Sequence, residues 1–160
     1  MMNRILVAAS LVSVALLMPS VALAQAASTS TPPVRPFHEG PVWTITFVHT
    51  KPGLSLKYME YLATEWKKEQ DALKKAGLIL DYKVIGTESH SDKDWDVMLM
   101  TEFKDLATLE ANEDKIEAVA MQALDLNDQK FIQGYQERAS WREIIGDRLA
   151  REIILEPKAK

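Results

Sequence analysis

The chain has 160 residues, with 19 Lys or Arg against 23 Asp or Glu, and a net charge of −4 at pH 7. Without a cluster of basic residues, a chain of this charge lacks the positive surface that binds nucleic acid or anionic membranes. The absence of cysteine excludes disulfides, thiolate metal ligands, a cysteine nucleophile and a lipid anchor on an N-terminal cysteine.

The first 24 residues have the order of a secretory signal. Arg4 supplies the positive charge of the start, an apolar run covers residues 5–18, and Ala22-Leu23-Ala24 offers the small residues that a signal peptidase recognises. The apolar run is shorter than the roughly 20 residues that span a bilayer, which favours a cleaved signal over a membrane anchor. We therefore expect an exported protein, periplasmic or secreted, cleaved after Ala24 or Ala26 and without membrane contact afterwards.

The rest of the chain divides into a linker and one domain. Residues 25–41 are rich in Ala, Ser, Thr and Pro, a composition that buries little and predicts a flexible linker. Residues 42–160 have the length of one domain, long enough to bury a core.

The domain begins with a strand and a long helix. Residues 42–50 alternate in polarity and are dominated by β-branched and aromatic residues, which predicts a strand. Residues 54–76 carry apolar side chains at three- and four-residue spacing, which predicts an amphipathic helix that ends at Gly77.

Two more strands, two helical segments and a last strand complete the order. A polar turn, residues 88–94, separates two strands as in a hairpin. Asp105 is the expected N-cap of the first helical segment, and Asn127 or Asp128 that of the second. The predicted segments are 78–87, 95–103, 105–124, 127–144 and 149–155.

The resulting order, β-α-β-β-α-β with an extra helix before the last strand, predicts an α+β ferredoxin-like fold with an antiparallel sheet and helices on one face. A right-handed crossover makes the first two strands parallel, with the third antiparallel between them. Apolar residues occur on both faces of the predicted strands, so the second face needs a cover. A second copy would supply it, and we expect a homodimer. The alternative is a monomer whose second face is made polar by Thr44, Thr46, Asp81, Lys83 and Glu102.

This pattern resembles the dimeric α+β-barrel superfamily, in which two ferredoxin-like sheets pack face to face, and small uncharacterised exported bacterial proteins. The resemblance covers about residues 42–156 and rests on the topology and on VWTITFVHTKPG, EYLATEWKKEQDALKKAG and DWDVMLMTEF. The superfamily includes cofactor-independent monooxygenases, haem-binding and haem-degrading enzymes, and stress-response proteins. No residue motif defines it, so the resemblance implies no catalytic residue.

One candidate pocket lies between the sheet and the helices, where related folds hold their ligand. We expect the alternating residues of the first strand to face the helices, with His49 as a polar group among aromatic rings. The alternative is a core aromatic cluster with His49 at its rim. The predicted pocket residues are Trp43, Phe47, His49, Tyr58 and Trp66.

A second candidate is a polar cluster at one end of the sheet, where His49 meets His90, Asp94 and Asp96. A His beside a carboxylate can act as a general base, and two His with an Asp can bind a metal. Solvated loop residues are the simpler interpretation, and no tight ligand spacing occurs, so no metal site is predicted.

Two further pairs have helical spacing. Tyr58 and Tyr61 could flank a ligand or face solvent. Arg138 and Arg142 are one helical turn apart and could clamp an anion, although pairing with Glu137 or Glu143 is the simpler interpretation.

Two classes of function remain open. The first is an exported small-molecule-binding or structural protein, dimeric and without a cofactor. The alternative is a cofactor-independent monooxygenase, or a haem-binding or haem-degrading enzyme, that uses the pocket between sheet and helices. The sequence assigns no catalytic residue to either.

Overall fold

The computed structural model of the protein describes residues 35–91 and 93–156. The predicted signal, residues 1–24, and the first ten residues of the predicted linker lie outside the described residues. Within residues 35–91 and 93–156, no helix combines the length and apolar character that crossing a membrane requires.

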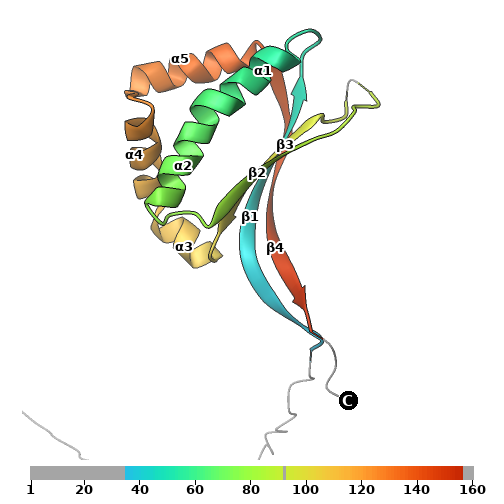
Figure 1. Ribbon diagram of the computed structural model, residues 1–160, viewed down its shortest axis with the longest axis vertical. Coiled ribbons are helices and arrows are strands. Elements are labelled where there is room, and N and C mark those ends of the chain that lie inside the picture. Colours follow the sequence, from blue (N-terminus) through green and yellow to red (C-terminus); the bar gives the residue numbers. More distant parts are fainter. Residues whose placement is uncertain (1–34, 92, 157–160) are drawn as a thin grey trace, which may run out of the picture. The chain divides into compact units, whose positions relative to one another are not determined.

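The structure confirms the predicted ferredoxin-like order, with the extra helix before the last strand. The sheet has the strand order β2-β3-β1-β4, and every neighbouring pair is antiparallel. Figure 1 shows the helices on one side of the sheet. The elements are β1 (Phe37–Thr50), α1 (Ser55–Tyr61), η1 (Leu62–Trp66), α2 (Lys67–Lys75), β2 (Asp81–Gly86), β3 (Val97–Phe103), α3 (Leu106–Ala111), α4 (Glu113–Ala123), α5 (Asp128–Ala139) and β4 (Arg142–Leu155).

The outer strands are longer than the sequence pattern predicts. Strand β1 begins at Phe37, so residues 37–41 belong to the sheet although their composition predicts a linker. Strand β4 begins at Arg142, where the sequence predicts a continuing helix. Both differences have one cause: β1 and β4 pair over their whole length, from Phe37–Leu155 to Thr50–Arg142, and cross-strand hydrogen bonds outweigh the local preference.

The predicted caps are confirmed at two helices. The Asp105 carboxylate accepts a hydrogen bond from the Thr108 N–H at 2.6 Å at the start of α3. The Asn127 side chain accepts one from the Lys130 N–H at 2.9 Å at the start of α5. Such caps satisfy backbone donors that have no partner within the first helical turn.

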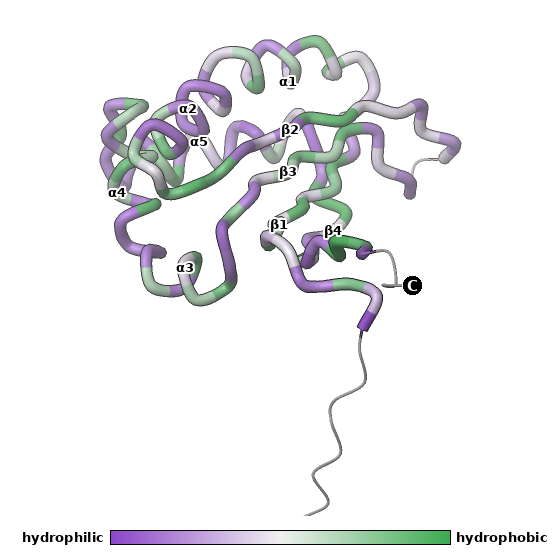
Figure 2. The backbone as a smooth tube through the Cα atoms, turned by 60° about the horizontal axis from the view of Figure 1, so that its bottom comes forward, coloured by the Kyte–Doolittle hydropathy of each residue, from purple (hydrophilic) through white to green (hydrophobic). Residues whose placement is uncertain are grey.

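The core lies between the sheet and the helix formed by α1, η1 and α2. It has two clusters of buried residues, one around Tyr58 and Trp66 and one around Leu73 and Phe103. Figure 2 shows polar and apolar residues interleaved along this helix, as expected for a helix with one buried face.

The long helix contains a turn that the sequence pattern does not predict. Residues Leu62–Trp66 form a π-helical turn, in which the Lys67 N–H bonds to the Leu62 carbonyl. Such a turn inserts one residue into the helix and rotates the residues beyond it about the helix axis. Residues before, within and after this turn are therefore all buried: Tyr58, Leu62, Trp66 and Leu73.

Strand β4 contains a bulge. Phe47 pairs with Gly146 and the next residue, Val48, pairs with Ile144, so Ile145 has no partner on β1. A bulge changes the alternation of side chains along a strand. Arg142 and Ile144 therefore share the helix-facing side with Asp147 and Leu149, because their partners on β1 are Thr50, Val48, Thr46 and Thr44.

Candidate functional site

Strand β1 presents to the helices the side opposite to the one predicted from its alternation. Val42 pairs with Phe103 and Val48 with Val97, and all four side chains are buried under the helices. Trp43, Phe47 and His49 alternate with them and lie on the other side, together with Ile45. We call this uncovered side the open face; its apolar residues include Trp43, Ile45, Phe47, Ile85, Met98 and Met100.

The expected orientation is wrong because both sides of β1 carry apolar residues, and the side with the larger aromatic rings is not the side that the helices cover. The smaller, β-branched valines fit beneath the closely packed helix. The aromatic rings of the open face instead find neighbours on the sheet itself. The Lys83 ammonium lies 5.0 Å from the centre of the Trp43 ring, and the Phe47 and Trp95 rings meet edge to face at 5.4 Å.

Tyr58 and Trp66 lie on the helix side and are core residues, 1% and 8% exposed. Both pack around Val48, and the Trp66 ring meets Tyr82 edge to face at 5.4 Å. The sheet therefore separates these two rings from Trp43, Phe47 and His49. The five predicted residues do not line one pocket, and binding of a ligand by any of them stays a prediction.

The segments that carry the predicted polar cluster lie near one end of the sheet, where the His90 N–H is 3.5 Å from an Asp94 carboxylate oxygen. No hydrogen bond joins the ring of His49 or His90 to a carboxylate among the described residues, and a functional role for the cluster stays a prediction. His49 Nδ1 lies 2.8 Å from the Asp94 carbonyl oxygen. The Asp96 carboxylate accepts hydrogen bonds from the Thr50 N–H at 3.0 and 3.1 Å and from the Thr50 hydroxyl. These bonds fasten the end of β1 to the segment before β3. Within residues 35–91 and 93–156, no three His, Asp or Glu side chains gather as metal ligands.

A different group of charged residues lies on the helix side, where α5 meets β4. Arg138 and Arg142 are half-buried, and the Nε atom of each is buried without a hydrogen-bond partner among the described residues. Neither pairs with Glu137 or Glu143, so the simpler interpretation of their spacing is wrong. Glu137 lies 3.8 Å from the Lys57 ammonium, and Glu143 follows Arg142 on a strand and so points to the opposite face.

The two arginines stack on two tyrosines of the long helix. The Arg142 guanidinium carbon is 5.6 Å from the centre of the Tyr58 ring, and that of Arg138 is 4.9 Å from the Tyr61 ring. The Tyr58 and Tyr61 rings stack on each other at 5.9 Å. Cation–π contacts of this kind stabilise a cation but leave its N–H donors unused.

Burial dominates the titration of both phenols. It raises the pKa of Tyr58 to about 12, against a smaller opposing effect of Arg142, and it also raises the pKa of Tyr61. Both hydroxyls therefore remain protonated and able to donate a hydrogen bond at neutral pH.

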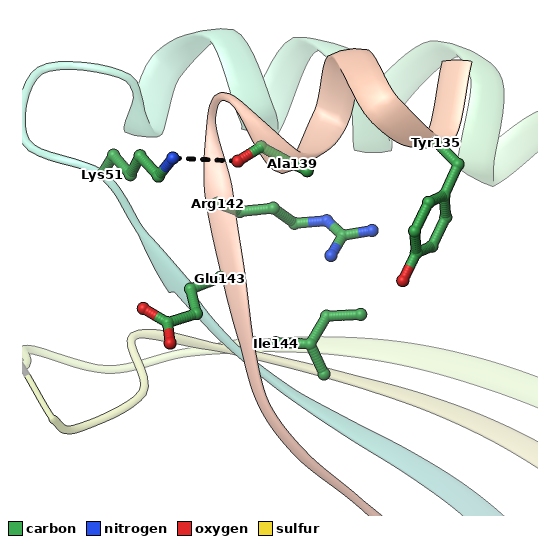
Figure 3. A pocket seen from close by; sticks show the side chains of 6 residues that line it. All are labelled: Lys51, Tyr135, Ala139, Arg142, Glu143 and Ile144. Carbon is green, nitrogen blue, oxygen red and sulfur yellow. Dashed lines mark hydrogen bonds between the residues drawn. The ribbon is translucent and has the colours of Figure 1, made fainter. Parts of the chain in front are cut away.

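A cavity of about 300 Å³ opens beside Arg142; we call it the α5 pocket, and Lys51, Tyr135, Ala139, Arg142, Glu143 and Ile144 line it. Figure 3 shows the Arg142 guanidinium extended toward the Tyr135 ring, with Glu143 pointing away from both. The Lys51 ammonium donates to the Ala139 carbonyl at 2.9 Å and closes one side, as Figure 3 also shows. The pocket thus combines two cations, Lys51 and Arg142, with the acidic Glu143, an aromatic ring and aliphatic side chains.

Sequence spacing identified the two arginines but not their geometry. An i, i+4 pair on one helix would place both guanidinium groups side by side. Helix α5 instead ends at Ala139, and Arg142 belongs to β4, so the two side chains approach the tyrosines from different elements. No sequence signal marked Tyr135 or Lys51, since an exposed Tyr and a turn Lys need no special explanation.

No protein-family model and no curated protein matches the chain. Among solved structures, it is similar to HapK from Hahella chejuensis, with 9% identity, a TM-score of 0.47, and coverage of 74% of this chain and 99% of that one. It is also similar to a dimeric ferredoxin-like protein from an uncultured marine organism, with 17% identity, a TM-score of 0.34, and coverage of 73% and 98%. Both likenesses are distant, and the fold assignment rests on the strand order itself.

Proposed function

We propose that the protein is an exported homodimer that binds a small molecule in the α5 pocket. The observation that carries this proposal is the pocket itself, a cavity of about 300 Å³ between α5 and β4 with charged, aromatic and aliphatic walls. Ligand sites are concave, mostly apolar and provided with a few polar groups that fix orientation, and this volume lies at the small end of their range.

Binding is tested by native mass spectrometry of the protein purified from its own compartment. We expect a co-purifying small molecule that is lost in Ala139→Phe, because the new ring would fill the pocket. Gln136→Phe adds the same ring to an exposed position of α5 that does not line the pocket, and should keep the ligand. A bare wild-type protein that also binds nothing from an extract of that compartment would contradict the binding role and favour a structural one.

The open face supports the homodimer. Its apolar side chains run across the sheet from the central strands β1 and β3 to the edge strands, where Ile85 of β2 and Ile145 of β4 are 41% and 40% exposed. Ile145, Phe47 and Trp95 also line a shallow cavity of about 280 Å³ on this side. A second sheet packed against this side would cover these residues.

Light scattering with size exclusion tests the dimer at micromolar concentration. We expect twice the chain mass for the wild type and the mass of one chain for Ile45→Glu, because a carboxylate would be buried in the middle of the interface. Leu56→Glu, at an exposed position of α1, should remain dimeric. A wild-type monomer would contradict the homodimer.

Export and the enzymatic alternative each have a direct test. When the full-length chain is expressed, cell fractionation should find the protein outside the cytoplasm and shortened by the cleaved signal, and deletion of residues 2–24 should retain it inside. A haem-handling protein would show a Soret band after purification, and an oxygenase that uses His49 would lose turnover in His49→Ala while remaining folded. His49 lies across the sheet from Tyr58 and Trp66, so an oxygenase that uses His49 would need a pocket on the open face.

A further inference from the structure

We infer that the ligand of the α5 pocket is an oxyanion, a carboxylate or a phosphate, carried on a small apolar body. Arg142, which lines the pocket, binds its charged group, and Arg138, which lies outside the lining on the neighbouring turn of α5, adds positive charge. This inference rests on the proposed binding function and specifies the chemistry of the ligand.

The two arginines have unused hydrogen-bond donors. A guanidinium group has five N–H donors in a planar fork, and neither Arg138 nor Arg142 makes a side-chain hydrogen bond or ion pair with the described residues. The buried Nε atoms are costly to leave unbonded. A carboxylate or phosphate accepts two parallel N–H bonds from one guanidinium and so matches this geometry.

The junction of α5 and β4 is also electropositive. Lys51, Lys57, Arg138 and Arg142 lie around it. Of the nearby carboxylates, Glu137 faces Lys57 and Asp96 accepts hydrogen bonds from Thr50; Glu143 lines the pocket, but its carboxylate extends away from the Arg142 guanidinium. Glu69 and Glu65 also lie near the Tyr61 ring. Burial raises the pKa of Glu69, Arg138 opposes this shift, and no hydrogen bond joins Glu69 to Arg138. The positive charge of the arginines is therefore free to attract an anion.

The walls of the pocket suit an apolar body behind the anionic group. Tyr135 and Ile144 form the wall opposite Lys51, and Phe131 stands one helical turn before Tyr135 on α5. Tyr135 is 52% exposed and Phe131 43%, so both rings have free surface at this side of α5. A single aromatic ring or a short aliphatic chain fits this volume better than a bare inorganic ion would.

Gly134 keeps the space beside Arg138 open. A methyl group at this position would lie 3.0 Å from Nη1 of Arg138, so the glycine leaves room for the guanidinium along α5. Glycine in the middle of a helix costs about 1 kcal/mol relative to alanine. Alanine at position 134 would require the Arg138 guanidinium to shift.

The test compares three probes on the wild-type protein: benzoate, phenyl phosphate and the neutral benzamide. Binding is followed by Trp fluorescence, because Trp141 contacts the Tyr61 ring at 6.3 Å, and by thermal shift. We expect at least one anion to bind about tenfold or more tightly than benzamide, with the affinity falling as salt rises. The better anion then identifies a carboxylate or a phosphate as the natural head group.

Arg142→Gln should lower the affinity for that anion by about tenfold or more, and Arg142→Lys should lose most of the same amount because an ammonium cannot make the paired bonds. Arg151→Gln removes the same charge at the far end of β4, where its partner is Glu39, and should bind as the wild type does. If Arg142→Gln does not fold, the affinities of the wild-type protein for the two anions and for benzamide are enough to test the inference.

Two results would overturn the inference, and they differ in whether the α5 pocket remains a ligand site. Equal binding of benzoate, phenyl phosphate and benzamide would keep the α5 pocket as a ligand site but remove the oxyanion. Binding of none of the three at about 10 mM, well above the millimolar Kd expected of such fragments, would overturn the inference. The proposed function itself is then judged by the co-purified ligand and Ala139→Phe.

Discussion

The long helix that carries Tyr58 and Tyr61 and the helix α5, which carries Arg138, are held in place by different interactions. The helix formed by α1, η1 and α2 buries Tyr58, Leu62, Trp66 and Leu73 against the sheet. Helix α5 buries no residue fully, and Lys51, Lys57 and Arg138 attach it through one hydrogen bond, one ion pair and one cation–π contact. The long helix therefore belongs to the framework, whereas α5 rests on polar contacts that a ligand can strengthen or replace.

The largest expected effect on stability is that of Trp66→Ala, in the helix formed by α1, η1 and α2. Removal of this 8% exposed ring leaves a cavity beside Val48 and Tyr82, and should lower the free energy of unfolding by about 3–5 kcal/mol. Urea denaturation followed by circular dichroism measures it. A loss below about 1 kcal/mol would mean that the helix is not anchored by this cluster.

Gly134→Ala sharpens the comparison by moving stability and binding in opposite directions. Better helix propensity should stabilise α5 by about 1 kcal/mol, or raise Tm by about 3 °C. The new methyl group should displace the Arg138 guanidinium and weaken anion binding. Unchanged affinity in a stabilised variant would show that Arg138 does not contact the anion from its present position.

The pH dependence of stability tests the contact between the two segments at Glu69. Burial raises the pKa of Glu69 in the folded protein above its ordinary value of 4.5, so its protonated form favours folding. Its contribution to the free energy of unfolding is full below pH 4.5 and is lost as pH rises through the folded pKa.

Glu69→Gln removes this titration. We expect the variant to lose less stability than the wild type between pH 4.5 and neutral pH, and to be the more stable of the two at neutral pH. Denaturation curves at several pH values measure the difference. Parallel pH profiles for the two proteins would contradict the raised pKa.

The smallest expected effect is that of Phe131→Ala, the same class of change as Trp66→Ala but on α5. Phe131 is 43% exposed, so its loss should lower the free energy of unfolding by about 1 kcal/mol or less. Hydrogen exchange should likewise be faster for the amides of α5 than for those of α2. A loss as large as that of Trp66→Ala would mean that α5 is covered in solution.

The element order was predictable because local signals marked most boundaries. The caps Asp105 and Asn127 and the stop at Gly77 all lie next to the elements that they delimit. The length of β1 and β4 was not predictable, since residues 37–41 and 142–148 become strand only through pairing between distant parts of the chain.

The candidate site was predictable only in part, for a physical reason. Alternation divides β1 into two sides, but both carry apolar residues, and only the packed helix decides which side is buried. Arg138 and Arg142 were visible as a spaced pair of cations. Their stacking on Tyr58 and Tyr61 depends on where α5 ends and β4 begins, which no local pattern marks.

The bulge at Ile145 decides the sign of the charge beside the tyrosines. Arg142 lies opposite Thr50, and so faces the helices, only because Ile145 is left out of the pairing with β1. If Ile145 paired with Val48 in even alternation, Glu143 would lie opposite Thr50 and Arg142 would turn to the open face. Two registers of one strand would thus present opposite charges to the same pocket, with the composition of the chain unchanged. Deletion of Ile145 would leave Arg142 opposite Thr50 in an evenly paired strand and so remove the second register.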